Sequence, residues 1–268
     1  RANIAAFGGD GGNITVSGFS AGGRDVMAML ISPLFKGQFQ RAISISGGMT
    51  ISDGEASAKI AARALAPLVV ADKVKASEEE AYRWLLSSSP EVGSYLRGVA
   101  ADRLAGLMTN AGIRMAVFPH LFNDGVVLPK DGFATAAYNS VPLVMLTSSK
   151  EFSLFARSDP EFAAIKDEEL MANVERLRAY AFANDYGSKL YELFNAQESA
   201  EAMFAGYKAP IYTLRIGWGG NPAIVGERMA KVYGSFHGVW IPFVTSATSG
   251  FSASFPAAFD NAGGRDLS

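Results

Sequence analysis

The sequence contains no cysteine. Disulfide bonds, thiolate metal sites and a catalytic cysteine are therefore excluded. The absence of cysteine favours a cytoplasmic location, because it is compatible with a reducing compartment. The sequence begins at Arg1, with neither an initiator Met nor a secretory leader, and says nothing about a leader peptide upstream of this residue.

The chain also lacks an excess of one charge and any long apolar run. Lys and Arg number 24 against 26 for Asp and Glu, which gives a net charge of -2, and no dense basic cluster occurs. This balance argues against a nucleic-acid surface. No apolar run reaches the ~18 residues expected of a membrane span, so we expect no membrane partner.

Apolar residues make up 49% of the chain, enough for one sizeable core. We find no internal repeat or low-complexity linker and expect one α/β domain over 1–268. Short β-branched or apolar runs predict strands at 14–16, 41–46, 141–147 and 211–216. Helical patterns occupy 21–31, 56–70, 77–86, a segment opening at Pro90, 167–183, 188–194, 198–206 and 225–232. The helices after residue 56 interrupt the run of strands, as a cap insertion does.

The segment 14–28 has the pattern of a nucleophile elbow: a strand, then Gly-x-Ser-x-Gly, then a helix. Gly18 and Gly22 remove Cβ atoms that would clash where the chain turns sharply around Ser20. Ser20 would then lie at a tight bend with its hydroxyl exposed. The backbone N–H of Ala21, at the start of the helix, is one donor of an oxyanion hole in such an elbow.

A serine nucleophile needs a base, usually a histidine, and the chain has two histidines. In this architecture the order along the chain is serine, acid, histidine. His120 precedes the strand at 141–147 and lies in a Pro-flanked loop, so we interpret it as structural. His237 follows the last predicted strand beside a glycine, and we assign the base to it.

Several carboxylates are candidates for the triad acid. Glu151 is the best placed, because it directly follows a buried strand, where α/β sheets carry their functional groups. Asp124 and Asp131 are alternatives, and each is more simply a turn residue. A solvated loop charge is the competing interpretation of Glu151.

Five blocks of the sequence resemble the type B carboxylesterase and cholinesterase family, in the family's order. These blocks are 3–23, 30–47, 123–129, 141–151 and 236–244. The resemblance implies an α/β-hydrolase fold, with a mostly parallel sheet, flanking helices and helical cap insertions. It implies Ser20 as nucleophile, Glu151 as acid and His237 as general base, without a metal or organic cofactor. It also implies that Ala21 donates one oxyanion N–H and that Ser46 helps to hold the acid.

Three positions depart from the pattern of that family. Phe19 stands where members usually carry Glu, Trp240 where they carry an acidic residue, and Phe152 where they carry Gly. The two lost acids belong to one buried polar network in relatives, and a half-satisfied network is costly. Our hypothesis is that Phe19 and Trp240 replace that network with apolar contact.

Family members are considerably longer, and their other oxyanion donors lie on a loop upstream of the elbow. We therefore predict that the protein has an N-terminal portion carrying further strands, as part of the same protein or as a separate chain. The expected function is hydrolysis of a small-molecule carboxylic ester through an acyl-enzyme. The alternatives are a non-catalytic relative with a binding or adhesion role, and an amidase or a hydrolase specialised for one natural product.

Overall fold

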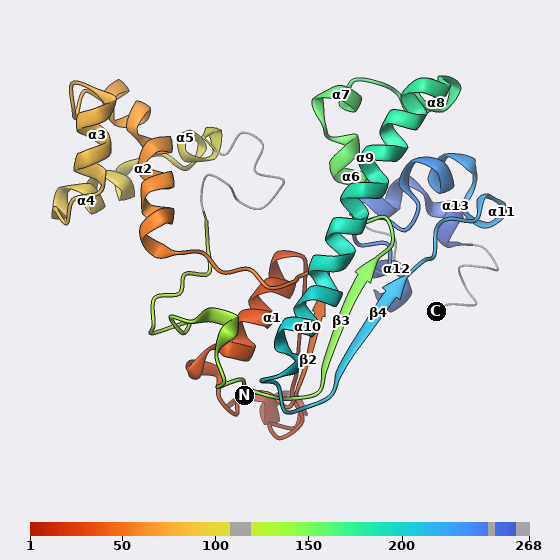
Figure 1. Ribbon diagram of the computed structural model, residues 1–268, viewed down its shortest axis with the longest axis horizontal. Helices are drawn as coiled ribbons and strands as arrows, with labels where there is room; N and C mark the ends of the chain where they lie inside the picture. Colours follow the sequence, from red (N-terminus) through yellow and green to blue (C-terminus); the bar gives the residue numbers. More distant parts are fainter. Residues whose placement is uncertain (108–118, 246–249, 261–268) are drawn as a thin grey trace. The chain divides into compact units, whose positions relative to one another are not determined.

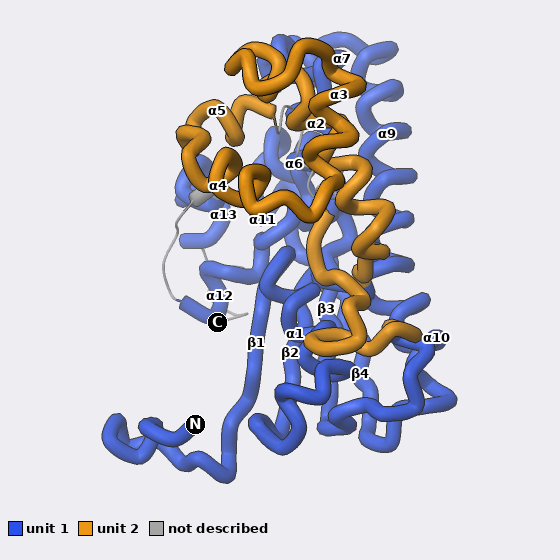
Figure 2. Tube along the Cα trace, turned by 90° about the vertical axis from the view of Figure 1, so that its left-hand side faces the viewer, with its two compact units in different colours: residues 1–49, 133–268 blue, residues 50–132 orange. Residues whose placement is uncertain are grey.

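The computed structural model describes residues 1–107, 119–245 and 250–260. The chain divides into two compact units, which Figure 2 colours differently. Unit 1 combines Arg1–Met49 with Phe133–Ser268, and unit 2 is Thr50–Gly132. Unit 2 is thus the insertion that the sequence predicts between the second and third strands. The expectation of a single domain over 1–268 stays a prediction.

Unit 1 contains a parallel four-stranded sheet in the order β1-β2-β3-β4 (Figure 1). Its strands are β1 (Thr15–Phe19), β2 (Arg41–Ile45), β3 (Leu143–Ser148) and β4 (Ile211–Ile216). All four lie within a few residues of the predicted runs, which confirms the strand predictions. Within the described ranges, no further strand pairs with the outer edge of β1 or of β4.

The helices of unit 1 lie in the segments that follow β1, β3 and β4. They are α1 (Ala21–Ile31), α6 (Ser153–Arg157), α7 (Pro160–Ala163), α8 (Asp167–Ala172), α9 (Val174–Glu192), α10 (Glu198–Phe204), α11 (Pro222–Val225), α12 (Ile241–Thr245) and α13 (Pro256–Phe259). Single 3-10 turns occur at Ile4–Phe7, Pro33–Phe35, Gly132–Ala134 and Gly250–Ser254, and π-helical turns at Leu193–Gln197 and Met229–Tyr233.

The predicted break between two helices at 167–183 and 188–194 is wrong in its position. The chain breaks earlier, at Asn173, whose side chain accepts the N–H of Arg176 at 3.0 Å and caps α9. α9 then continues through Gly187. A Cβ at Gly187 would lie 2.2 Å from Cδ1 of Phe152, so this glycine makes room for a ring and does not end the helix.

One face of the sheet is covered by α1 and by the α9–α10 segment. A register row of the sheet joins Val16, Ala42, Leu143 and Ile211 and packs in one hydrophobic cluster with side chains of these helices. The side chains of the next register row point to the opposite face of the sheet, and Tyr212 is the β4 member of this row. Tyr212 is 56% exposed and Leu214, two residues on, is 53% exposed. The two faces of the sheet are therefore unequally buried.

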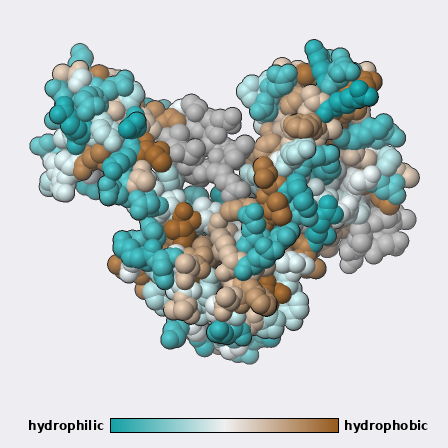
Figure 3. All heavy atoms as spheres, viewed as in Figure 1, coloured by the Kyte–Doolittle hydropathy of each residue, from teal (hydrophilic) through white to brown (hydrophobic). Residues whose placement is uncertain are grey.

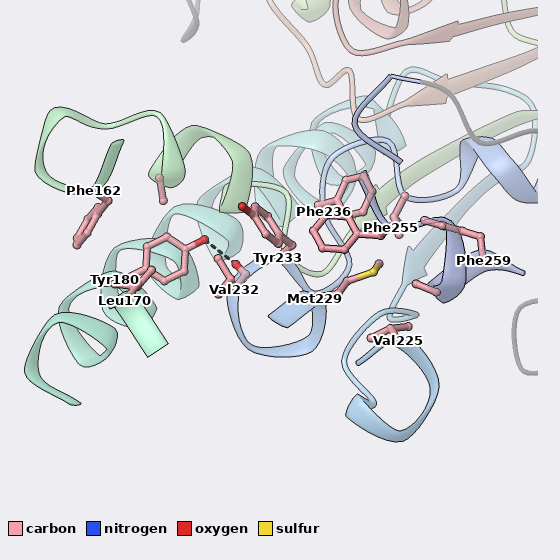
Figure 4. Packing of buried hydrophobic residues seen from close by; sticks show 13 residues of the cluster. Phe162, Leu170, Tyr180, Val225, Met229, Val232, Tyr233, Phe236, Phe255 and Phe259 are labelled. Atoms are coloured by element: carbon pink, nitrogen blue, oxygen red, sulfur yellow. Dashed lines mark hydrogen bonds between the residues drawn. The ribbon is translucent and has the colours of Figure 1, made fainter. Parts of the chain in front are cut away.

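A second hydrophobic cluster packs the segments that follow β3 and β4 (Figure 4). Its largest fully buried side chain is Tyr180, from α9. The Tyr180 hydroxyl donates to the carbonyl of Val232 at 2.6 Å, and burial holds the pKa of this phenol well above its usual value. This bond ties α9 to the segment that precedes His237.

Unit 2 contains α2 (Gly54–Ala71), α3 (Glu78–Leu85), α4 (Pro90–Gly98) and α5 (Ala101–Gly106). Ser77 caps α3, because its hydroxyl accepts the N–H of Glu80 at 3.3 Å. The Glu80 carboxylate accepts the N–H of Ala76 at 3.2 Å, one residue before the position of a capping box. Ala66, Val69 and Ala81 form a small core between α2 and α3.

None of the described helices combines the length and apolarity needed to cross a membrane. On the face drawn in Figure 3, hydrophobic residues of each unit are interspersed among hydrophilic ones.

Candidate active site

Ser20 lies between the last residue of β1 and the first residue of α1. Its backbone has φ +57° and ψ -115°, a conformation that costs a non-glycine residue about 1–3 kcal/mol. The Ser20 N–H donates to the carbonyl of Ile45, at the end of β2, at 2.8 Å. The strained turn is therefore anchored to the neighbouring strand, and it has the geometry that the elbow pattern predicts.

Two glycines are required by close backbone approaches at this turn. A Cβ at Gly18 would lie 2.0 Å from the carbonyl oxygen of Gly22, so Gly18 acts as predicted. A Cβ at Gly22 itself would have nothing within 4 Å, so the predicted clash there is wrong. Gly23 is the second tight position, because its Cβ would lie 2.8 Å from the carbonyl oxygen of Ile45.

Ala21 is the first residue of α1. The first N–H groups of a helix have no partner within the helix and carry the positive end of its dipole. Ala21 directly follows Ser20, and its N–H lies at the start of the helix. This position is suited to stabilise a negative charge that develops beside the Ser20 hydroxyl. Its role as an oxyanion donor stays a prediction.

Glu151 follows β3 by three residues, and its side chain is fully buried. One carboxylate oxygen, Oε1, accepts three hydrogen bonds. Ser46 Oγ donates at 2.5 Å, Thr147 Oγ1 at 3.2 Å and the Ser148 N–H at 2.6 Å. The predicted contact of Ser46 with the acid is present, although Ser46 lies 105 residues away in the sequence. Three neutral donors compensate for the buried charge.

The other oxygen of this carboxylate, Oε2, lies 2.5 Å from Nδ1 of His237. The backbone sets this approach: the Lys150 N–H donates to the Ser235 carbonyl at 3.0 Å, and the Ser235 hydroxyl donates to the Ile216 carbonyl at 2.8 Å. With Nδ1–H donated to the carboxylate, Nε2 of the neutral imidazole keeps its lone pair. The structure thus brings Glu151 and His237 together, in unit 1, which also contains Ser20.

Aromatic rings surround the imidazole. The Phe19 ring centroid lies 4.5 Å from that of His237 and 5.6 Å from that of Trp240, and Phe155 lies 5.7 Å from His237. Trp240 Nε1 is buried and has no hydrogen-bond partner in the described part of the chain. The predicted apolar contact between Phe19 and Trp240 is therefore present. That it replaces a polar network of relatives stays a prediction.

The alternative residues lie in unit 2. Asp124 Oδ1 accepts the N–H groups of 126–128 at 2.9, 2.8 and 3.1 Å, and these bonds lower the pKa of the Asp124 carboxyl. Asp124 is therefore a turn residue, and Asp131 is an exposed residue of the loop that follows. His120 also belongs to unit 2. No group of three or more His, Asp or Glu side chains able to hold a metal ion occurs within the described residues.

Two buried residues of the site are absent from the sequence-based predictions. Thr147 donates to Glu151, and Asn195 donates from Nδ2 to Thr147 Oγ1 at 3.3 Å. A hydroxyl near the end of an apolar strand is a signal that could have identified Thr147. Asn195 lies in a helical pattern, where an amide normally faces solvent, and the sequence offers no signal for it.

Known proteins match this chain in sequence and in structure. Para-nitrobenzyl esterase of Bacillus subtilis is 28% identical over 260 residues, 91% of this chain and 48% of that protein. Liver carboxylesterase 1 of Oryctolagus cuniculus is 33% identical over 164 residues, 56% of this chain and 27% of that protein. A solved PNB esterase superposes with a TM-score of 0.58 at 26% identity, covering 92% of this chain and 52% of its own.

A solved carboxylesterase of Geobacillus stearothermophilus superposes with a TM-score of 0.59 at 22% identity, over 96% of this chain and 52% of its own, and supports the fold alone. The chain spans about half the length of the para-nitrobenzyl esterases it matches. The sequence model of the carboxylesterase family matches residues 1–211. With its parallel sheet and flanking helices shared with these esterases, the chain belongs to the carboxylesterase family and has an α/β-hydrolase fold, as the resemblance predicts.

Proposed function

We propose that the protein to which this chain belongs hydrolyses carboxylic esters through a triad of Ser20, His237 and Glu151. The observation that carries the proposal is the 2.5 Å contact between His237 Nδ1 and the buried Glu151 carboxylate. This contact forms at the carboxyl ends of the strands, and Ser20 directly follows the carboxyl end of β1. Membership of the carboxylesterase family and the esterase activity named for the relatives support it.

In the proposed reaction, Ser20 Oγ attacks the ester carbonyl carbon while His237 Nε2 accepts the hydroxyl proton. The carbonyl oxygen becomes an oxyanion, to which the Ala21 N–H donates. When the C–O bond to the alcohol breaks, the imidazolium returns its proton to the leaving oxygen, and an acyl-enzyme remains. His237 then removes a proton from water, whose oxygen attacks the acyl carbon, and Ser20 leaves with the proton restored.

Glu151 stays ionised throughout these steps. Its Oε2 orients the imidazole and stabilises the positive charge that His237 carries while each tetrahedral intermediate exists. The charge forms in a site enclosed by Phe19 and Phe155, where few water molecules screen the attraction between carboxylate and imidazolium.

A single N–H donor is a weak oxyanion hole. Removing one donor typically lowers turnover about 100- to 1,000-fold. We therefore propose that an N-terminal portion of the protein, in the same chain or as a second one, supplies the other donors. Two observations support this proposal: among the described residues no strand pairs with the outer edge of β1, and the chain covers 48% of the Bacillus relative.

A fluorophosphonate probe tests the proposal on the purified native protein. Intact mass is measured before and after labelling, and the adduct is mapped by peptide sequencing. One adduct on Ser20, absent from Ser20→Ala and from unfolded protein, is the expected result. A native protein that takes up no label overturns the proposal and favours a non-catalytic binding relative. Turnover of a p-nitrophenyl ester but not of the matching anilide separates an esterase from an amidase.

A further inference from the structure

The helix that follows the candidate site departs from α-helical geometry at the π-helical turn Leu193–Gln197, between α9 and α10. A π-helical turn holds one extra residue, and such turns often occur at functional sites. Asn195 and Ala196 are both buried at this turn. The Ser199 hydroxyl donates to the Phe194 carbonyl at 2.7 Å and satisfies one acceptor of the widened turn.

The buried Asn195 amide begins a chain of hydrogen bonds that ends on the triad acid. Nδ2 donates to Thr147 Oγ1 at 3.3 Å, and that hydroxyl donates to Glu151 Oε1 at 3.2 Å. A hydroxyl has only one proton. Because Asn195 donates to the Thr147 oxygen, the Thr147 proton is directed to the carboxylate, and each bond polarises the next.

We propose that Asn195 is a positioning residue for the triad, acting through Thr147 on Glu151. The relay adds a third donor to Oε1, beside the Ser46 hydroxyl and the Ser148 N–H, and so helps to keep Oε2 as the oxygen that faces His237. The π-helical turn brings the Asn195 amide to Thr147, because a regular helix would rotate this side chain away by about 100°. The inference rests on the proposed function, and its test is arranged so that the two fail separately.

The test compares four variants of the active protein with the wild type. Thr147→Val removes the hydroxyl with little change of shape, Thr147→Ser restores it, Asn195→Leu removes the amide donor, and the last variant combines Thr147→Val with Asn195→Leu. We expect kcat for an ester to fall about tenfold in Thr147→Val and Asn195→Leu, with KM unchanged, and to recover in Thr147→Ser. The double variant should be no slower than Thr147→Val, because Asn195 acts only through that hydroxyl.

Asn139→Leu is the matched control for loss of a structural amide. Nδ2 of Asn139 donates to the carbonyls of Met29 and Ser32 at 2.8 and 2.7 Å, at the end of α1. This variant should lower the melting temperature while leaving kcat unchanged. Multiplying losses in the double variant, or an equal loss of kcat in Asn139→Leu, would show a merely structural role and overturn the inference.

A spectroscopic readout serves even if the protein turns over no ester or if Asn195→Leu fails to fold. The imidazole Nδ1–H of His237 is observed by proton NMR in 15N-histidine-labelled protein and assigned by its loss in His237→Gln. The resonance should move in Thr147→Val and Asn195→Leu and be retained in Thr147→Ser and Asn139→Leu. An unchanged resonance in Thr147→Val would overturn the proposed role of Thr147 and Asn195. A wild-type protein whose Ser20 takes up no fluorophosphonate would overturn only the proposed function.

Discussion

Two carboxylates lie in the interior of unit 1, and their partners differ in kind. Asp167 has a side chain 11% exposed, its Oδ1 lies 3.1 Å from the Arg157 guanidinium, and its Oδ2 accepts the Tyr233 hydroxyl at 2.7 Å. Glu151 is 0% exposed and has no Lys or Arg within ion-pair distance among the described residues. It is held by two hydroxyls, one backbone N–H and His237.

The difference determines what each carboxylate can do. An arginine stays charged at every accessible pH, so Asp167 has a permanent counter-charge and serves to join α8 to the segment before His237. Within the part of the chain that the structure describes, the one ionisable partner of Glu151 is a histidine, the side chain whose charge changes near neutral pH in general. No Lys or Arg among the described residues neutralises Glu151, so its carboxylate can stabilise the imidazolium when His237 gains a proton. A buried carboxylate becomes useful to catalysis when its neighbours do not already neutralise it.

The substitution Glu151→Gln should have the largest effect, because it removes the charge and leaves the shape. We expect kcat to fall about 10,000-fold, since the amide no longer selects the Nδ1–H tautomer or stabilises the imidazolium. Stopped-flow ester hydrolysis measures this, and circular dichroism checks the fold. A variant that keeps a tenth of the wild-type kcat would contradict the assignment of the acid.

The substitution Arg157→Ala should destabilise the surroundings of the Asp167 carboxylate and leave ester hydrolysis unchanged. It removes the nearer of two cations from Asp167, leaving Arg228 Nε at 3.7 Å from Oδ2, and also removes hydrogen bonds to the carbonyls of Phe162 and Ile165. We expect the free energy of unfolding to fall by about 3 kcal/mol. Urea titration gives this value, and kcat measured well below the melting temperature should match the wild type. A large loss of kcat in folded protein would place Arg157 in the active site instead.

Trp240→Glu places a further carboxylate near the imidazole, against the Phe19 ring. The Phe19 ring offers this carboxylate no hydrogen-bond donor, so we expect a loss of about 2 kcal/mol in stability and reduced activity. Trp240→Phe is the control, because it keeps an aromatic ring against Phe19 and should change both quantities much less. If Trp240→Glu left stability and activity unchanged, the hypothesis of a compensating apolar pair with Phe19 would be dropped.

The smallest expected effects come from removing one hydroxyl from each carboxylate. Ser46→Ala should lower kcat about tenfold with a modest loss of stability, because Glu151 loses its shortest donor. Tyr233→Phe should cost about 1 kcal/mol in stability and leave kcat unchanged. Burial raises the pKa of the Tyr233 phenol, so it remains a donor to Asp167 at neutral pH. Thermal melts and initial rates are measured on both variants. Equal losses of kcat in Ser46→Ala and Tyr233→Phe would contradict the difference between the two carboxylates.

The sequence contains strong local signals for the strands, and these predictions are confirmed. It also marks the three residues of the triad, of which Glu151 and His237 lie in contact, while the triad as a whole stays a prediction. Ser20 is marked by its glycines, and Glu151 and His237 by their place after apolar runs. The error at Gly22 arises because the pentapeptide shows which residues are small without showing which backbones approach. Only the fold reveals that Gly23 lies against β2.

Other features of the site depend on contacts between distant segments and leave no mark in a local pattern. Asn195 is buried because of a π-helical turn, and a one-residue bulge inside a helix has no periodic signature. The Phe152 ring is accommodated by Gly187, which lies in α9. The predicted boundary between 183 and 188 is wrong because α9 continues through this glycine.

The backbone bridge between Lys150 and Phe236 has a consequence for evolutionary divergence. A main-chain contact between two adjacent loops sets the spacing of the backbone segments that carry the acid and the base, while hydroxyls such as those of Ser46 and Thr147 hold the carboxylate itself. Positions that contact neither this bridge nor the carboxylate oxygens, such as Phe19 and Trp240, can then change while the two backbone segments stay in register. Successive single substitutions at such positions would therefore alter the lining of the site without displacing the segments that carry Glu151 and His237.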